Sequence, residues 1–180
     1  MTYETLKGRR VVVGVCGSIA AYKACDLVSK LVQVGAEVRV VMTRSATQFV
    51  GPTTFRALSG SDVAVELFGA IPEMEIEHIS LAEFGEALIL VGATANVIGK
   101  ITGGICDDLL TTTVCAAKGR VLLAPAMNWR MWGNPITQRN VEALRDLGYV
   151  FVGPDAGHLA CGDTGSGRLA AREDMLDALD

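Results

Sequence analysis

The sequence lacks the features that would place it among membrane, secreted or nucleic-acid-binding proteins. No stretch reaches the roughly 18 uninterrupted apolar residues of a membrane span, because polar residues such as Arg39, Asn96 and Asp107 interrupt every hydrophobic run. The start of the chain has charges but no apolar segment of a signal peptide. Only 20% of the residues are charged, the net charge is −4, and no basic cluster is present. We expect a cytoplasmic protein whose partner is a small molecule, with no membrane and no nucleic acid.

Cysteine occurs in an odd number and without a metal-binding or disulfide pattern. The five cysteines include no Cys-x-x-Cys pair, which argues against a disulfide framework and a zinc ribbon, so no metal site is expected. Cys16, Cys25, Cys106 and Cys115 lie on or beside predicted strands and helices, where we expect them to pack as small hydrophobic residues. Cys161 differs, because it lies in the glycine-rich segment 153–168. That segment cannot be core, and we expect it to form a flexible lid.

The chain does contain a regular alternation of short apolar runs and helical patterns. The runs at 10–15, 36–42, 87–91, 121–124 and 149–152 are typical of strands, most of them buried on both faces. Apolar residues recur at helical spacing from Ile19 to Val34, and Asn134-Pro135 marks the start of another helix. Half of the 180 residues are apolar, which suffices for one core. We expect a single domain over 1–180 with an α/β, three-layer Rossmann-like fold, a mostly parallel sheet with helices on both faces.

Ligands of such sheets bind at the carboxyl ends of the strands. The first run is followed by Gly17-Ser18-Ile19, a turn before a helix whose free N–H groups favour an anion, although such turns also serve tight packing alone. The second run ends near Thr43 and Ser45, which either bind a phosphate or cap the next helix. After the third run, the small residues Ala93-Thr94-Ala95-Asn96 can lie against a flat heterocycle. The pattern favours a mononucleotide over NAD.

Both tryptophans, two methionines and one amide gather after the fourth run, in the segment Pro125–Trp132. Core packing explains the apolar side chains but not Asn128, because an unpaired buried amide costs about 1–3 kcal/mol. A substrate carboxylate or amide is a reasonable partner for it. His78 has acidic residues on its amino-terminal side, although a lone histidine is more often structural than catalytic. His158 lies in the glycine-rich segment, where we expect it to be solvated.

Together, segments from nearly the whole chain resemble the flavin-containing cysteine decarboxylases. The matching segments are Gly17–Lys23, Ala93–Asn96, Asp107–Thr112, Pro125–Trp132 and Ala160–Asp163. The resemblance implies the cofactor FMN and a carboxy-lyase reaction of coenzyme A biosynthesis, the decarboxylation of 4′-phosphopantothenoyl-L-cysteine to 4′-phosphopantetheine. In that chemistry the flavin first oxidises the thiol carbon, which lets carbon dioxide leave, and then reduces the product.

The resemblance also implies a role for each matching site residue. His78 would assist the oxidative, decarboxylating half of the reaction, Asn128 would bind the substrate carboxylate, and Cys161 on the lid would supply a proton in the reductive half. Met131 would line the substrate site. The implied cofactor-binding residues are Gly17, Ser18, Ile19, Thr43, Ser45, Ala93, Thr94, Ala95 and Asn96.

Two positions depart from the family pattern. Relatives usually have proline where this chain has Gly92, a change that would loosen the loop beside the flavin. Many relatives have serine at the position of Cys16. A thiol is a poorer phosphate donor than a hydroxyl, so Ser18 or backbone N–H groups would have to compensate if that position contacts FMN.

Two other functions remain open at this point. The segment Pro125–Trp132 also fits a peptidyl-cysteine decarboxylase that modifies the end of a precursor peptide, whereas Ala160–Asp163 favours the coenzyme A reaction. A non-catalytic flavin-binding regulatory protein is the third interpretation, and the presence of His78, Asn128 and Cys161 weighs against it. The resemblance further implies a homotrimer or dodecamer with sites between subunits. A separately encoded phosphopantothenate–cysteine ligase is a candidate partner.

Overall fold

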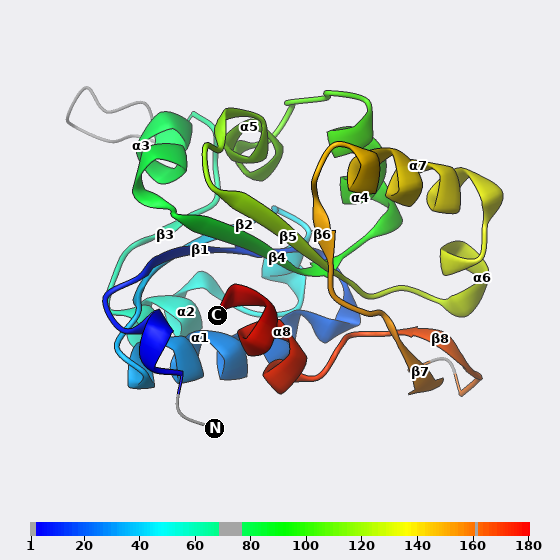
Figure 1. The fold of residues 1–180 in the computed structure, drawn as a ribbon, viewed down its shortest axis with the longest axis horizontal. Coiled ribbons are helices and arrows are strands. Elements are labelled where there is room, and N and C mark those ends of the chain that lie inside the picture. Colours follow the sequence, from blue (N-terminus) through cyan, green and yellow to red (C-terminus); the bar gives the residue numbers. More distant parts are fainter. Residues whose placement is uncertain (1–2, 69–76, 161) are drawn as a thin grey trace.

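The fold is built on a six-stranded parallel sheet with the strand order β3-β2-β1-β4-β5-β6 (Figure 1). The computed structural model describes residues 3–68, 77–160 and 162–180. The strands are β1 (Arg10–Val15), β2 (Glu37–Met42), β3 (Val63–Ala64), β4 (Ala87–Ala93), β5 (Arg120–Pro125) and β6 (Val150–Phe151). Each strand that the sequence predicts is therefore present, within a few residues of its expected bounds.

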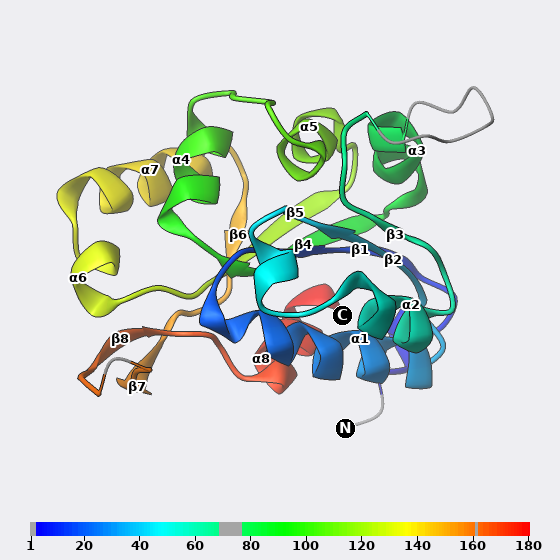
Figure 2. The ribbon, with the colours of Figure 1, turned by 180° about the vertical axis from the view of Figure 1, so that it is seen from behind.

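Helices cover both faces of this sheet, as expected. One face carries α1 (Lys23–Gln33), α2 (Pro52–Ser59) and α8 (Arg172–Leu179), and the other carries α3 (Glu77–Phe84), α4 (Ala95–Thr102), α5 (Leu109–Ala116) and α7 (Pro135–Asp146). Figure 2 shows the same two layers from behind. Shorter helices are η1 (Glu4–Leu6), η2 (Ile19–Tyr22), η3 (Ala46–Gln48) and α6 (Trp129–Trp132). Within the described ranges, no helix has the length and apolar character needed to cross a membrane.

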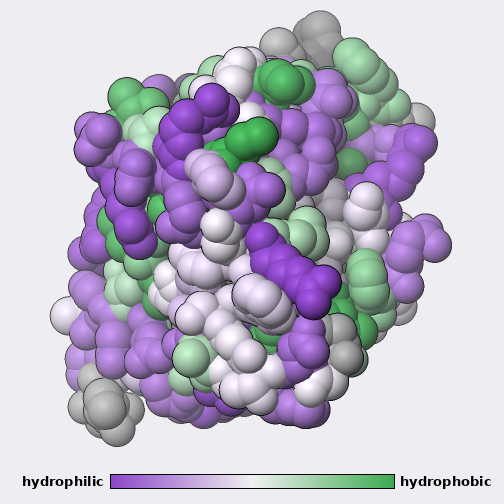
Figure 3. All heavy atoms as spheres, turned by 90° about the vertical axis from the view of Figure 1, so that its right-hand side faces the viewer, coloured by the Kyte–Doolittle hydropathy of each residue, from purple (hydrophilic) through white to green (hydrophobic). Residues whose placement is uncertain are grey.

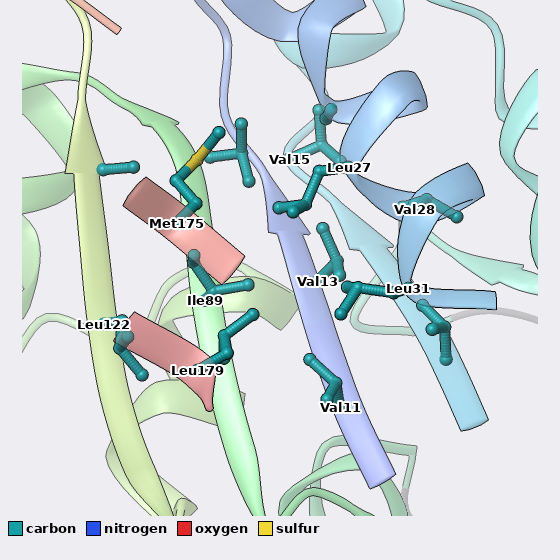
Figure 4. Close-up of a cluster of buried hydrophobic side chains, with 14 of the residues drawn as sticks. Val11, Val13, Val15, Leu27, Val28, Leu31, Ile89, Leu122, Met175 and Leu179 are labelled. Atoms are coloured by element: carbon teal, nitrogen blue, oxygen red, sulfur yellow. The ribbon is translucent and has the colours of Figure 1, made fainter. Parts of the chain in front are cut away.

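The central strand β1 shows why the apolar runs are continuous. Val11, Val13 and Val15 point to the face covered by α1 and pack in the same cluster as Leu27 (Figure 4), while Val12 is buried against the helices of the opposite face. Successive side chains of a strand point to opposite faces, so a strand covered on both sides needs apolar residues at every position. Burying each valine or leucine contributes about 1.5–3 kcal/mol.

Two regions differ from the sequence-based expectation. The helix expected from Ile19 begins as the 3₁₀ turn η2 and becomes α-helical only at Lys23. The glycine-rich segment expected to be a loop forms an antiparallel hairpin of β7 (Asp155–His158) and β8 (Thr164–Arg168), which lies beside α6 in Figure 1. Whether this hairpin moves as a lid stays a prediction.

Candidate functional site

A cavity of about 600 Å³ opens at the carboxyl ends of β1, β4 and β5. Its wall is formed by residues of the turn after β1, by Thr94 after β4, by residues of the segment Ala126–Met131 after β5, and by the hairpin β7–β8. Figure 3 shows the side of the molecule that carries α6 and the hairpin, where side chains of neutral hydropathy gather between hydrophilic ones. The cavity therefore lies where a parallel sheet is expected to bind its ligand.

The turn after β1 holds a buried hydroxyl group. Ser18 is only 9% exposed, and among the residues that the structure describes its Oγ finds no hydrogen-bond partner. Gly92, whose φ is +70°, makes room beside that oxygen, because a Cβ at this position would collide with Ser18 Oγ. An unsatisfied buried hydroxyl costs about 1–3 kcal/mol. A ligand that accepts a hydrogen bond from Ser18 would remove this cost.

The same turn fits the phosphate of the expected FMN. A Cβ at Gly17 would collide with the Cβ of Ser45, so glycine allows the backbone after β1 to approach the segment after β2. Beyond the turn, η2 leads directly into α1, whose dipole favours an anion at its amino end. Lys23, the first residue of α1, also lines the cavity. Hydroxyl, helix end and ammonium group together suit a phosphate.

Thr43 and Ser45 stand beside this turn rather than in the cavity wall formed by the described residues. Thr43 Oγ1 accepts a hydrogen bond from Ala46 N at 3.2 Å and so caps η3. Ser45 is exposed and lies against Gly17. Of the two predicted roles, helix capping therefore applies to Thr43. A contact of Thr43 or Ser45 with a phosphate stays a prediction.

The segment after β4 contributes one side chain to the cavity wall that the structure describes. Thr94 lines the cavity and its Oγ1 accepts a hydrogen bond from Val97 N at 3.2 Å, which caps α4. Ala93 is fully buried at the end of β4. Ala95 is half-buried and Asn96 is exposed, both on the first turn of α4. Contact of these residues with a flavin ring stays a prediction.

Asn128 and Met131 lie in the same cavity as Gly17, Ser18 and Ile19. Asn128 is the N-cap of α6, where its Oδ1 accepts a hydrogen bond from Arg130 N at 2.9 Å. This bond fixes the orientation of the amide. Met131 is half exposed at the cavity. The structure therefore brings together the residues that the sequence analysis placed at the ends of β1 and β5.

The hairpin β7–β8 is docked onto the segment that contains Asn128. Met127 N donates a hydrogen bond to Gly167 O at 3.0 Å, and Trp129 Nε1 donates one to Asp163 Oδ2 at 3.1 Å. A Cβ at Gly165 would lie 2.8 Å from the Cβ of Trp129, so the glycines of the hairpin allow this close packing.

Several hairpin residues complete the cavity wall, and the sequence analysis did not identify them. They are His158, Leu159, Ala160, Gly167, Arg168 and Leu169. His158 is exposed, as expected, but it also faces the cavity. Cys161, the expected proton donor, lies outside the described residues. The one available signal was the glycine content of the segment, which indicated a lid but not which side chains it presents.

His78, a predicted catalytic residue, does not line the cavity formed by the described residues. It is half-buried near the start of α3, which packs against α5. Figures 1 and 2 both show α3 and α6 at opposite ends of the molecule. Burial raises the pKa of the neighbouring Glu77 carboxyl. A single copy of the chain does not bring His78 to Asn128.

The cysteines of the described residues divide into buried and exposed ones. Cys16 is fully buried, and burial raises the pKa of its thiol above the ordinary range, so it is not a nucleophile. Cys25 is half-buried against the core. The packing interpretation is wrong for Cys106 and Cys115, which are exposed. In the described part of the chain, no group of three histidine, cysteine or acidic side chains could hold a metal ion.

Comparisons with known proteins point to one family. The family model described as Flavoprotein matches residues 1–180. The coenzyme A biosynthesis bifunctional protein CoaBC of Bacillus subtilis (strain 168) is 48% identical over 171 residues, which cover 95% of this chain and 42% of that protein. The chain thus spans less than half the length of the CoaBC proteins that it matches.

Solved structures share the fold over nearly the whole chain. A PPC decarboxylase mutant complexed with pantothenoylaminoethenethiol is 31% identical with a TM-score of 0.84, over 96% of this chain and 97% of that one. The FMN-dependent cysteine decarboxylase SpaF is 32% identical with a TM-score of 0.82, over 97% of this chain and 99% of that one.

Proposed function

The chain belongs to the flavoprotein family, and from this premise we propose that it catalyses the FMN-dependent decarboxylation of 4′-phosphopantothenoyl-L-cysteine to 4′-phosphopantetheine. The observation that carries the proposal is the convergence of Ser18, Asn128 and the hairpin β7–β8 on one cavity. The 48% identity with a CoaBC protein supports this substrate over a peptidyl cysteine. A phosphopantothenate–cysteine ligase, separate or within the same longer protein, would supply the substrate.

The turn after β1 would hold the FMN phosphate through Ser18 Oγ, which lacks another partner among the described residues. The helix end and Lys23 would add favourable charge. When bound, FMN supplies a two-electron oxidation of the thiol-bearing carbon of the substrate and returns the electrons to the product. The reaction is then redox-neutral overall, and carbon dioxide is the leaving group.

Asn128 would bind the substrate carboxylate, whose position decides where carbon dioxide leaves. Its backbone is fixed at the start of α6 and its Oδ1 is held by Arg130 N, so little side-chain entropy is lost on binding. Apolar neighbours in the wall, Ala126, Leu159 and Leu169, limit the access of water. A carboxylate that is poorly hydrated loses carbon dioxide more readily than a hydrated one.

Cys161 would donate the proton that completes the saturated product. This role comes from the resemblance, and the neighbouring Ala160 lines the cavity. A Cys161→Ser variant is expected to release carbon dioxide but to accumulate the unsaturated thiol. Mass spectrometry distinguishes the two products by two hydrogens, and a normal yield of saturated thiol would remove the assignment.

A second copy of the chain would supply His78, because α3 lies at the opposite end of the molecule from α6 (Figures 1 and 2), whose Met131 lines the cavity. Exposed apolar side chains near the cavity, such as Ile19, Tyr22 and Phe49, would be covered in the resulting homotrimer or dodecamer. Mixing inactive His78→Asn and Asn128→Asp subunits tests this. If sites lie between subunits, random assortment restores about a quarter of the sites. No restoration would place both residues in one subunit.

The substrate is tested by competition. Purified protein loaded with FMN receives equal concentrations of phosphopantothenoylcysteine and a peptide ending in cysteine, and both products are followed by mass. The proposal expects conversion of the first compound only. Conversion of the peptide instead would establish the peptidyl-cysteine alternative, and conversion of neither with FMN bound would favour the regulatory protein.

A further inference from the structure

A second cavity of about 370 Å³ adjoins the first one. Tyr22, Lys23, Arg168 and Leu169 line both cavities, so these four residues form the boundary between them. The second cavity continues toward the start of α8 and is lined there by Arg172. Asn128 belongs only to the first cavity.

The charges at this boundary are not balanced. Arg172 is already paired, with its Nη1 2.9 Å from Asp26 Oδ1 and with a further contact to Glu173. Arg168 has a weaker partner, because its Nη2 lies 3.5 Å from Asp155 Oδ2 at a partly exposed position. Lys23 forms no ion pair with any residue that the structure describes. Since Lys23 would serve the FMN phosphate, Arg168 is the boundary cation that retains the capacity to bind the phosphate of the substrate.

A buried donor adds to this capacity. Arg172 Nε is buried and has no hydrogen-bond acceptor among the described residues. A buried N–H group without an acceptor is unfavourable. The lining of the second cavity therefore offers donors that the described protein atoms do not satisfy.

We propose that Arg168 binds the phosphate group of the substrate, so that the second cavity selects the phosphorylated form. The inference rests on the proposed function and adds a specificity residue to it. The substrate carries its carboxylate and its phosphate at opposite ends. With the carboxylate at Asn128 in the first cavity, an extended substrate would direct its phosphate toward the boundary that Arg168 lines. A guanidinium group binds phosphate in a bidentate manner, which a hydroxyl or an amide does not.

Two other roles for Arg168 give different outcomes. Arg168 could serve only to hold the hairpin, because it pairs with Asp155 and packs over Gly157, where a Cβ would lie 3.2 Å from Arg168 Cζ. It could also bind the FMN phosphate in place of Ser18. The first role affects every substrate equally, and the second affects retention of the cofactor.

The experiment compares phosphopantothenoylcysteine with its dephosphorylated analogue, pantothenoylcysteine, on the FMN-loaded protein. Arg168→Gln is expected to raise KM for the phosphorylated compound by about tenfold to hundredfold, with kcat and the KM for the analogue changed less than about twofold. Arg168→Lys, which keeps the charge, should restore part of the affinity. Arg56→Gln, at an exposed arginine of α2, is the matched control and should change nothing.

Several results would overturn the assignment. An equal loss for both compounds in Arg168→Gln, reproduced by Asp155→Asn, would mean that Arg168 only holds the hairpin. Loss of bound FMN, measured by absorbance, would assign Arg168 to the cofactor. If the wild-type protein converts both compounds with equal KM, the phosphate assignment alone fails. If it converts neither, the proposed function fails and this assignment with it.

Discussion

Replacing Ser18 by alanine is expected to stabilise the FMN-free protein and to weaken FMN binding. Ser18 Oγ is buried beside Gly92 and has no partner among the described residues. In the FMN-free protein the hydroxyl is therefore a cost, whereas in the complex it would donate a hydrogen bond to the phosphate. One substitution thus has opposite effects in the two states, which a general loss of packing would not produce.

The magnitudes follow from the free energies of the two states. A buried, unsatisfied hydroxyl costs about 1–3 kcal/mol, so Ser18→Ala should raise the free energy of unfolding of the FMN-free protein by about 1 kcal/mol or more. For a domain of this size, 1 kcal/mol raises Tm by about 2–4 °C. A hydrogen bond to a charged group contributes about 1.5–3 kcal/mol, so the Kd for FMN should rise by about tenfold to hundredfold.

Thermal unfolding of the FMN-free protein and titration of flavin fluorescence measure the two effects. Thr113→Val is the control, because Thr113 is fully buried but its Oγ1 donates to Leu109 O at 2.7 Å. That variant should gain no stability and should keep the wild-type Kd for FMN. A fall in Tm for FMN-free Ser18→Ala, or an unchanged Kd, would refute the reasoning.

Three further predictions concern other parts of the chain. Cys106 and Cys115 should react with a thiol reagent in the folded protein because they are exposed, while buried Cys16 should react only after unfolding. Mass mapping of the labelled residues checks this, and labelling of folded Cys16 would contradict it. Gly92→Ala should lower the free energy of unfolding, measured in urea, by about 2 kcal/mol or more, because alanine is strained at φ +70°. An unchanged urea midpoint would contradict the positive φ of Gly92. Trp129→Phe removes the Nε1 hydrogen bond to the hairpin and should speed proteolytic cleavage there severalfold, whereas an unchanged cleavage rate would mean that the contact does not hold the hairpin.

The sheet and half of the site could be predicted from the sequence, because both follow from local patterns. A strand buried on both faces needs a continuous apolar run, as in β1, and the residues just after such runs meet at one edge of the sheet. Ser18 and Asn128 were found in this way, although they are far apart in the chain, and the structure places both in one cavity.

The hairpin contribution could not be predicted, because it depends on non-local pairing. The strands β7 and β8 contain several glycines and little apolar alternation, so the pattern did not indicate that they pair or that Arg168 faces a cavity. The exposure of Cys115 likewise depends on which side of α5 packs against the sheet. The distance of His78 from Asn128 follows from the placement of α3, which no local pattern determines.

The most direct test of the central claim is the release of labelled carbon dioxide from phosphopantothenoylcysteine that carries the label in its cysteine carboxylate. The purified protein is assayed with and without bound FMN, and the remaining product is identified by mass. The account predicts release only with FMN, in equal amount with 4′-phosphopantetheine. Release without FMN, or no release from the FMN-loaded protein, would contradict it.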